Sequence, residues 1–135
     1  MEKARKHLLK AEHLLKATIY LKKGKFSDIC TSTLFYAMYH CLLAIAVKFG
    51  YESRNQECTF ALIYSLIEEK EIDFDEKLLH EISSLNPKET NEKTSIEIRE
   101  QYQYETDLSL KDKEIYDELL ELAKKIINKT KDILS

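Results

Sequence analysis

The sequence predicts an all-α protein, folded as an antiparallel up-and-down bundle of four or five helices. Apolar residues recur every three or four positions along most of the chain, which is the spacing of one helix face. Glycine and proline, which interrupt regular segments, number only two and one in 135 residues. No stretch keeps the alternation of a β-strand beyond residues 72–74. We expect residues 1–135 to form one domain, since this length buries a core without metals or disulfides.

The first helix is expected from a seven-residue repeat near the N-terminus. The members of the repeat are Ala4, Leu8, Ala11, Leu15 and Thr18. Charged residues fall between them, so the helix is amphipathic. We expect Gly24 to end it by adopting the left-handed conformation, which glycine accepts without steric cost.

The second helix is expected to begin near Ser27 and Asp28, whose side chains can cap a helix N-terminus. It is apolar on nearly every side, so we expect it to be the central helix and Gly50 to end it. The apolar run at 34–49 is interrupted by His40 and a lysine, and it falls short of the roughly 18 residues that a membrane span needs. No membrane association is therefore expected.

The rest of the chain predicts further helices and one loop. Two shorter apolar segments lie around 60–67 and 78–82. After them, Pro87 and a polar tract predict a mobile surface loop over about 84–95. The last helix carries apolar residues at spacings of four, three, four and seven, typical of a coiled-coil seam: Ile115, Leu119, Leu122, Ile126 and Ile133.

Charge, motifs and cysteine content exclude several classes of function. Lys and Arg number 21 against 24 Asp and Glu, so broad DNA binding through phosphate neutralisation is not expected. None of the four histidines has a Glu three positions before it, as a di-iron bundle requires, and no glycine-rich phosphate loop is present. We therefore predict no metal and no cofactor. Three cysteines without paired spacing predict a cytoplasmic protein, with Cys30 and Cys41 as small buried apolar side chains.

Two groups of residues carry polar chemistry, and the first lies in the second helix. Tyr36 and His40 are one helical turn apart, so they share a face. Either both side chains pack in the bundle with their polar ends hydrogen-bonded locally, or their face lines a cleft. Packing is the commoner outcome for such residues, and the sequence leaves both interpretations open.

The second group runs from Arg99 to Tyr104. Arginine is scarce, at three of the 21 basic residues, which indicates that its planar fork matters at this position. Tyr102 shares a helix face with Arg99, whereas Tyr104 lies about 140° away from it on an ideal helix. Arg99 and Tyr104 therefore converge only if the helix ends or bends there. The alternative is an ordinary amphipathic helix end.

Three stretches of the sequence together resemble a known family. They are the spaced Ala and Leu residues of 4–15, then Phe26-Ser27-Asp28, then Tyr36-Ala37-Met38-Tyr39-His40. This pattern resembles the small prokaryotic HEPN-domain proteins, and the stretch from Arg99 to Tyr104 is similar to an R-x-x-x-Q-Y motif in one branch of that family. The resemblance covers almost the whole chain except about residues 84–95.

The resemblance implies a helical bundle that usually dimerises and is commonly encoded beside a minimal nucleotidyltransferase, in toxin–antitoxin pairs. Active members are metal-independent ribonucleases whose motif is an arginine, four to six residues, and then a histidine. Arg99 stands at the place of the motif arginine, and Tyr104 stands where the histidine would be. A tyrosine of pKa about 10 is only about a thousandth ionised at pH 7, so we expect binding without efficient cleavage.

Three functional hypotheses follow from the residues and the resemblance. The first is binding of RNA or a nucleotide by Arg99, Tyr36 and Tyr102, in a homodimer that pairs with a nucleotidyltransferase as toxin or accessory subunit. The second is an active ribonuclease that uses Arg99 with Tyr104 or His40. The third is a helical interaction module without a ligand.

Overall fold

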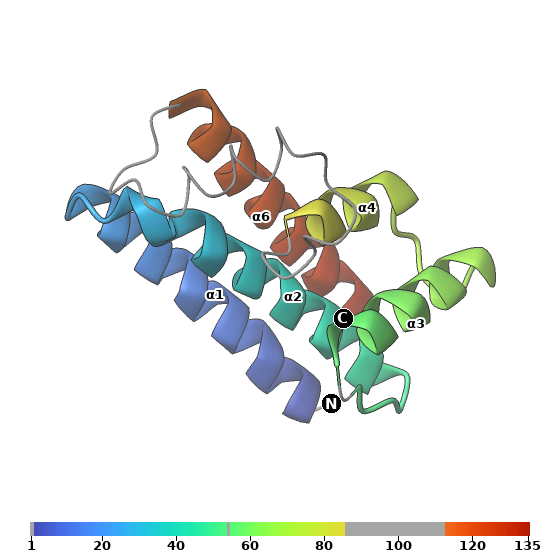
Figure 1. Cartoon of the computed structure of the whole chain (residues 1–135). Coiled ribbons are helices and arrows are strands. Elements are labelled where there is room, and N and C mark those ends of the chain that lie inside the picture. Colours follow the sequence, from blue (N-terminus) through green and yellow to red (C-terminus); the bar gives the residue numbers. More distant parts are fainter. Residues whose placement is uncertain (1, 54, 86–112) are drawn as a thin grey trace.

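The computed structural model describes residues 2–53, 55–85 and 113–135, and all regular structure within these ranges is helical. The elements are α1 (Glu2–Lys23), the short 3-10 helix η1 (Ser27–Ile29), α2 (Cys30–Lys48), α3 (Gln56–Glu68), α4 (Glu76–Ser84) and α6 (Lys113–Leu134). Figure 1 shows them gathered into one helical bundle. The predicted all-α class is confirmed.

Helix α2 is the central helix, as predicted. It contacts α1, α3, α4 and α6, and ten of its 19 residues are buried. Figure 1 shows α1 and α2 side by side along their length, with α6 beside them. The pair is antiparallel, because Ala4 near the start of α1 packs with Ala44 near the end of α2, and Leu134 of α6 completes that cluster.

The predicted buried face of α1 is confirmed. Ala4, Ala11 and Thr18 follow one another at seven-residue spacing and are fully buried. Their small side chains allow the α2 backbone to approach closely. The hydroxyl of Thr18 lies 2.6 Å from that of Thr33 on α2 and donates to the Leu14 carbonyl at 2.8 Å, so the buried polar atom is satisfied.

The end of α1 differs from the prediction by one residue. The left-handed residue is Lys25, with φ 69°, and not Gly24. The N–H of Phe26 donates to the Leu21 carbonyl at 2.8 Å, and that of Lys25 to the Lys22 carbonyl at 3.2 Å. These two bonds form a Schellman motif, which requires the positive φ at the residue after Gly24. At the end of α2 the prediction is confirmed, because Gly50 itself has φ 83°.

The start of α2 also corrects the prediction. Ser27 belongs to the 3-10 turn and α2 begins at Cys30, with no side-chain capping bond at either start. Within the described ranges, the segment Ser27–Lys48 is long and apolar enough to cross a membrane by length and composition, although its apolar run is interrupted. More than half of its apolar window, 56%, is buried inside the bundle, which is the packing of a core helix.

The remaining helices confirm the predicted apolar segments. The side chains of Asn55 and Asp75 cap α3 and α4 by accepting from backbone N–H groups in the first turn. In α6, Ile126 is fully buried, and the other members of the predicted seam from Leu119 onward pack against the core. Ile115 is the exception, because 37% of its surface is exposed, so the seam begins one turn later than predicted.

Candidate functional site

Tyr36 and His40 lie on the outward side of α2, one turn apart. Tyr36 is 37% exposed, while His40 is partly buried. The ring of Tyr36 packs by its edge against Phe35, with 5.4 Å between centroids and a 74° angle between planes. The packing of Tyr36 on Phe35 agrees with the interpretation of a packed helix face, while its exposure leaves room for the cleft interpretation. Its ring has a solvent-facing side.

His40 pairs with a second histidine that sequence reasoning did not single out. His7 of α1 and His40 of α2 face each other with 3.1 Å between their Nδ1 atoms. The ring centroids are 5.3 Å apart, close to the maximum set by the Nδ1 separation plus the two distances from nitrogen to centroid, and the planes differ by 30°. The rings therefore meet end to end. One Nδ1 carries a proton and donates it, and the other accepts.

The surroundings of the histidine pair disfavour its protonation. Partial burial lowers the pKa of His40, and His7 and Lys10 lower it further. Partial burial likewise lowers the pKa of His7, with a smaller contribution from Lys3. At neutral pH the pair is therefore uncharged and its lysine neighbours carry the local positive charge. Lys3 also forms an exposed ion pair with Glu52.

These side chains form one surface on α1 and α2, which we call the α1–α2 patch. Its members are Lys3, His7, Lys10, Tyr36 and His40. It combines two ammonium groups, a proton-accepting pair of imidazoles and a partly exposed aromatic ring. The only sequence signal for His7 is its place between Lys3 and Lys10 on one side of α1. Its contact with His40 depends on how the two helices are aligned.

The cysteines offer no nucleophile near this patch. Cys30 and Cys41 are fully buried, which confirms their predicted role as small apolar side chains. Burial raises the pKa of Cys41 to about 12, so its thiol stays protonated although His40 precedes it in the sequence. Among the described residues, no group of three or more His, Cys, Asp or Glu side chains is placed to hold a metal ion.

The other predicted site residues, Arg99, Tyr102 and Tyr104, lie outside the described residues. The same is true of nearly all of the predicted loop at 84–95. Ser84 and Leu85 are the exceptions: Ser84 is the last residue of α4 and Leu85 is the helix C-cap, so the helix extends into the start of the predicted loop.

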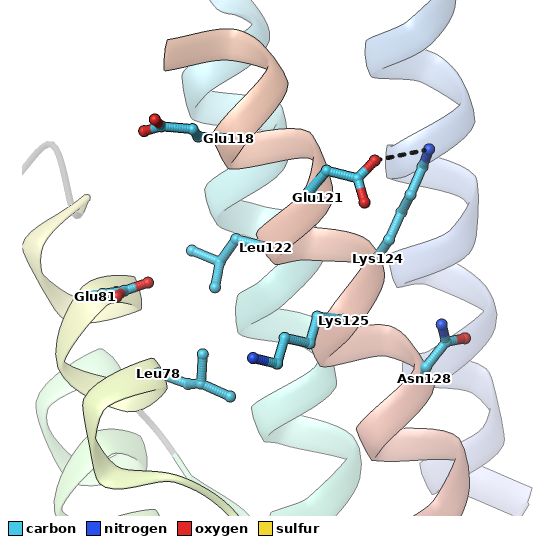
Figure 2. Close-up of a pocket in the computed structure, with 8 residues that line it drawn as sticks. All are labelled: Leu78, Glu81, Glu118, Glu121, Leu122, Lys124, Lys125 and Asn128. Atoms are coloured by element: carbon cyan, nitrogen blue, oxygen red, sulfur yellow. Dashed lines mark ion pairs between the residues drawn. The ribbon is translucent and has the colours of Figure 1, made fainter. Parts of the chain in front are cut away.

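A groove of about 660 Å³ lies between α4 and α6 and is chemically unlike the patch. Figure 2 shows Leu78 and Lys125 projecting toward each other across it. Glu121 forms an ion pair of 3.5 Å with Lys124 on the side nearer α1. Three carboxylates face two lysines, so the groove does not favour a phosphate group. The residues that line it are Leu78, Glu81, Glu118, Glu121, Leu122, Lys124, Lys125 and Asn128.

The fold and the patch define a small helical-bundle domain whose polar side chains gather on the outer face of two paired helices. Comparison with known families identifies the family to which this helical domain belongs. The model of the HEPN domain matches residues 4–133, so the chain belongs to the HEPN family, a nucleotide- and RNA-related class of helical domain. A search of curated proteins found no match.

Proposed function

We propose that this HEPN-domain protein binds RNA or a nucleotide at the α1–α2 patch together with Arg99 and Tyr102. The observation that carries the proposal is the grouping of basic and aromatic side chains on one outward face. Lys3 and Lys10 supply positive charge for a phosphate group. The partly exposed ring of Tyr36 offers a surface on which a base can stack.

Arg99 is proposed as the principal phosphate ligand, for reasons that come from the sequence. Its guanidinium can contact two phosphate oxygens at once, which a lysine cannot reproduce. It stands at the place of the family's motif arginine, while Tyr104 replaces the motif histidine. Tyr102 shares the helix face predicted for Arg99 and would add a second ring.

Binding without efficient cleavage is favoured over ribonuclease activity. Cleavage through the 2′-hydroxyl needs one group to remove a proton and another to supply one to the leaving oxygen. His40 has its Nδ1 engaged with His7, and its pKa lies below the usual range, so few molecules carry the protonated form at pH 7. An active site of Arg99 with His40 or Tyr104 remains the second candidate, and it would operate without metal.

The wider role that we propose is that of a cytoplasmic toxin or accessory subunit paired with a minimal nucleotidyltransferase. A homodimer is part of this proposal. Apolar side chains outside the α1–α2 patch are exposed just before α2 begins: Phe26 and Ile29 have 58% and 43% of their surfaces exposed. Covering exposed apolar side chains with a second copy of the chain, in a symmetric dimer, is the commonest solution. Light scattering at micromolar concentration should give the mass of a dimer, and a monomer would contradict this part.

The binding proposal is tested by titrating labelled single-stranded RNA and adenine nucleotides against wild type and Arg99→Lys. Loss of the bidentate contact should weaken binding roughly tenfold, with an unchanged melting temperature. Lys16→Gln is the matched control, because Lys16 is an exposed lysine of α1 outside the patch. Since few phosphates are engaged, the affinity should fall only shallowly with salt.

Three outcomes would redirect the proposal. Equal affinity of wild type and Arg99→Lys would remove Arg99 from the site. Absence of binding by either would favour the ligand-free interaction module. RNA cleavage that persists in the presence of a chelator would favour the ribonuclease.

A further inference from the structure

We propose that the His7–His40 pair binds a terminal phosphate monoester and takes up one proton as it does so. This inference deepens the proposed function and rests on it: it names the ligand group, adds His7 to the site, and couples binding to pH. The ligand chemistry is the phosphate of a mononucleotide or of a 5′-phosphorylated RNA end.

The end-to-end geometry limits the pair to a single additional proton. In the uncharged pair one proton lies between the Nδ1 atoms, which are 3.1 Å apart. A first added proton goes to an Nε2 atom and leaves this bond intact. A second would place two N–H groups against each other at that distance and break the contact. The pair therefore switches between no charge and one positive charge.

The charges that face the pair favour an anion over a metal ion. From α1, Lys3 and Lys10 are close enough to lower the pKa of His7 and His40, respectively. From α2, the ring of Tyr39 meets His40 edge-on at 6.5 Å between centroids. Within the part of the chain that the structure describes, the carboxylate of Glu52 forms an ion pair with Lys3. One Nδ1 donates its proton to the lone pair of the other, so the two Nδ1 atoms do not converge on a metal ion.

The size of the cluster favours one terminal phosphate over a length of RNA backbone. Lys3 and Lys10 are two helical turns apart, about 10 Å along the axis, with the histidine pair between them. A phosphate monoester carries close to two negative charges at pH 7, whereas a phosphodiester carries one. Because Glu52 offsets the charge of Lys3, the Lys10 ammonium and one singly protonated imidazole pair leave two positive charges, which match the monoester better.

The direction of the pH dependence follows from linkage. The free pair is neutral at pH 7, and a bound dianion stabilises its protonated form, so binding raises the pKa of the pair. Affinity should therefore increase as the pH falls from 8 toward 6.5. Below about pH 6 the phosphate itself takes up a proton, and affinity should level off or fall.

The experiment is calorimetric titration of full-length protein with AMP, in buffers of different ionisation enthalpy, at pH 6.5, 7 and 8. Proton uptake approaching one per site at pH 7 is expected, with tighter binding at pH 6.5 than at pH 8. His7→Asn and His40→Gln should each abolish the uptake and weaken binding roughly tenfold. His13→Gln is the matched control, because His13 is an exposed histidine of the same helix. Melting curves confirm that each variant is folded.

A second titration distinguishes the two sources of phosphate and separates this inference from the binding proposal. RNA with a 5′-phosphate should bind more tightly than the same RNA with a 5′-hydroxyl, and only the former should depend on His7. RNA binding that depends on Arg99 but not on His7 or pH would overturn the inference and leave the proposed function standing. AMP binding with proton uptake, but without an effect of Arg99→Lys, would sustain the inference and remove the role of Arg99. Binding of Zn²⁺ by the pair in place of AMP would overturn the inference.

Discussion

The stability of the protein should fall as the pH is lowered from 7.5 to 5, and the histidine pair should account for most of this loss. Both histidines have pKa values below the usual range when the protein is folded, because they are partly buried and lie near lysines. In the unfolded chain each returns to about 6.5. Between the folded and unfolded pKa values the unfolded state binds more protons, so the free energy of unfolding rises with pH.

The size of the effect is bounded by the number of protons. One group that is protonated only in the unfolded state changes the free energy of unfolding by at most about 1.4 kcal/mol per pH unit. Two groups double this limit. Both rings are only partly buried, so solvent screens their interactions with the neighbouring charges. We therefore expect the free energy of unfolding to fall by about 1 kcal/mol in total between pH 7.5 and 5.

The assay is urea unfolding followed by circular dichroism at several pH values from 5 to 8. For the wild-type protein, the free energy of unfolding should increase with pH over this range. His40→Gln should reduce this slope by half or more, because it removes one titrating group and the repulsion that this group exerts on His7. His13→Gln should retain the wild-type slope. A wild-type stability that is constant or increases toward pH 5, or an equal change in the control, would refute the reasoning.

Three further predictions concern local structure. Lys70→Gly should raise the free energy of unfolding by about 1 kcal/mol in urea unfolding, because Lys70 ends α3 with φ 60°; no gain would mean that the left-handed turn is not formed. Asn55→Ala should lower it by about 1 kcal/mol in the same assay, because the Asn55 side chain accepts from the Cys58 N–H at 2.8 Å; an unchanged stability would contradict this cap. A thiol reagent at pH 8 should modify exposed Cys58 in the native protein and reach Cys41 only on unfolding, since burial raises the pKa of Cys41 to about 12; equal rates for both thiols would contradict that burial.

Features that depend on local periodicity could be predicted from the sequence. The buried positions Ala4, Ala11 and Thr18 follow from a seven-residue repeat, because a helix returns to the same face after two turns. The central place of α2 follows from its apolar residues on nearly every side. The family resemblance, carried largely by the residues from Tyr36 to His40, is confirmed over residues 4–133.

Features that depend on register could not be predicted. Whether Gly24 or Lys25 takes the left-handed conformation depends on which carbonyl groups accept from the N–H groups that follow the helix. The two possible helix ends differ by only one residue, so the sequence pattern does not distinguish them. The His7–His40 contact joins residues 33 positions apart and is set by the alignment of α1 with α2. A shift of one residue along either helix would point one of the rings elsewhere. The sequence therefore identified His40 and missed its partner.

The most direct test of a nucleotide- and RNA-binding surface on α1 and α2 is chemical-shift mapping by NMR, with a 5′-phosphorylated single-stranded RNA added to labelled protein. The largest changes should fall on Lys3, His7, Lys10, Tyr36 and His40, while the groove between α4 and α6 stays unchanged. Changes confined to Leu78, Glu81 and the other residues of that groove, or no changes at any RNA concentration, would contradict the account.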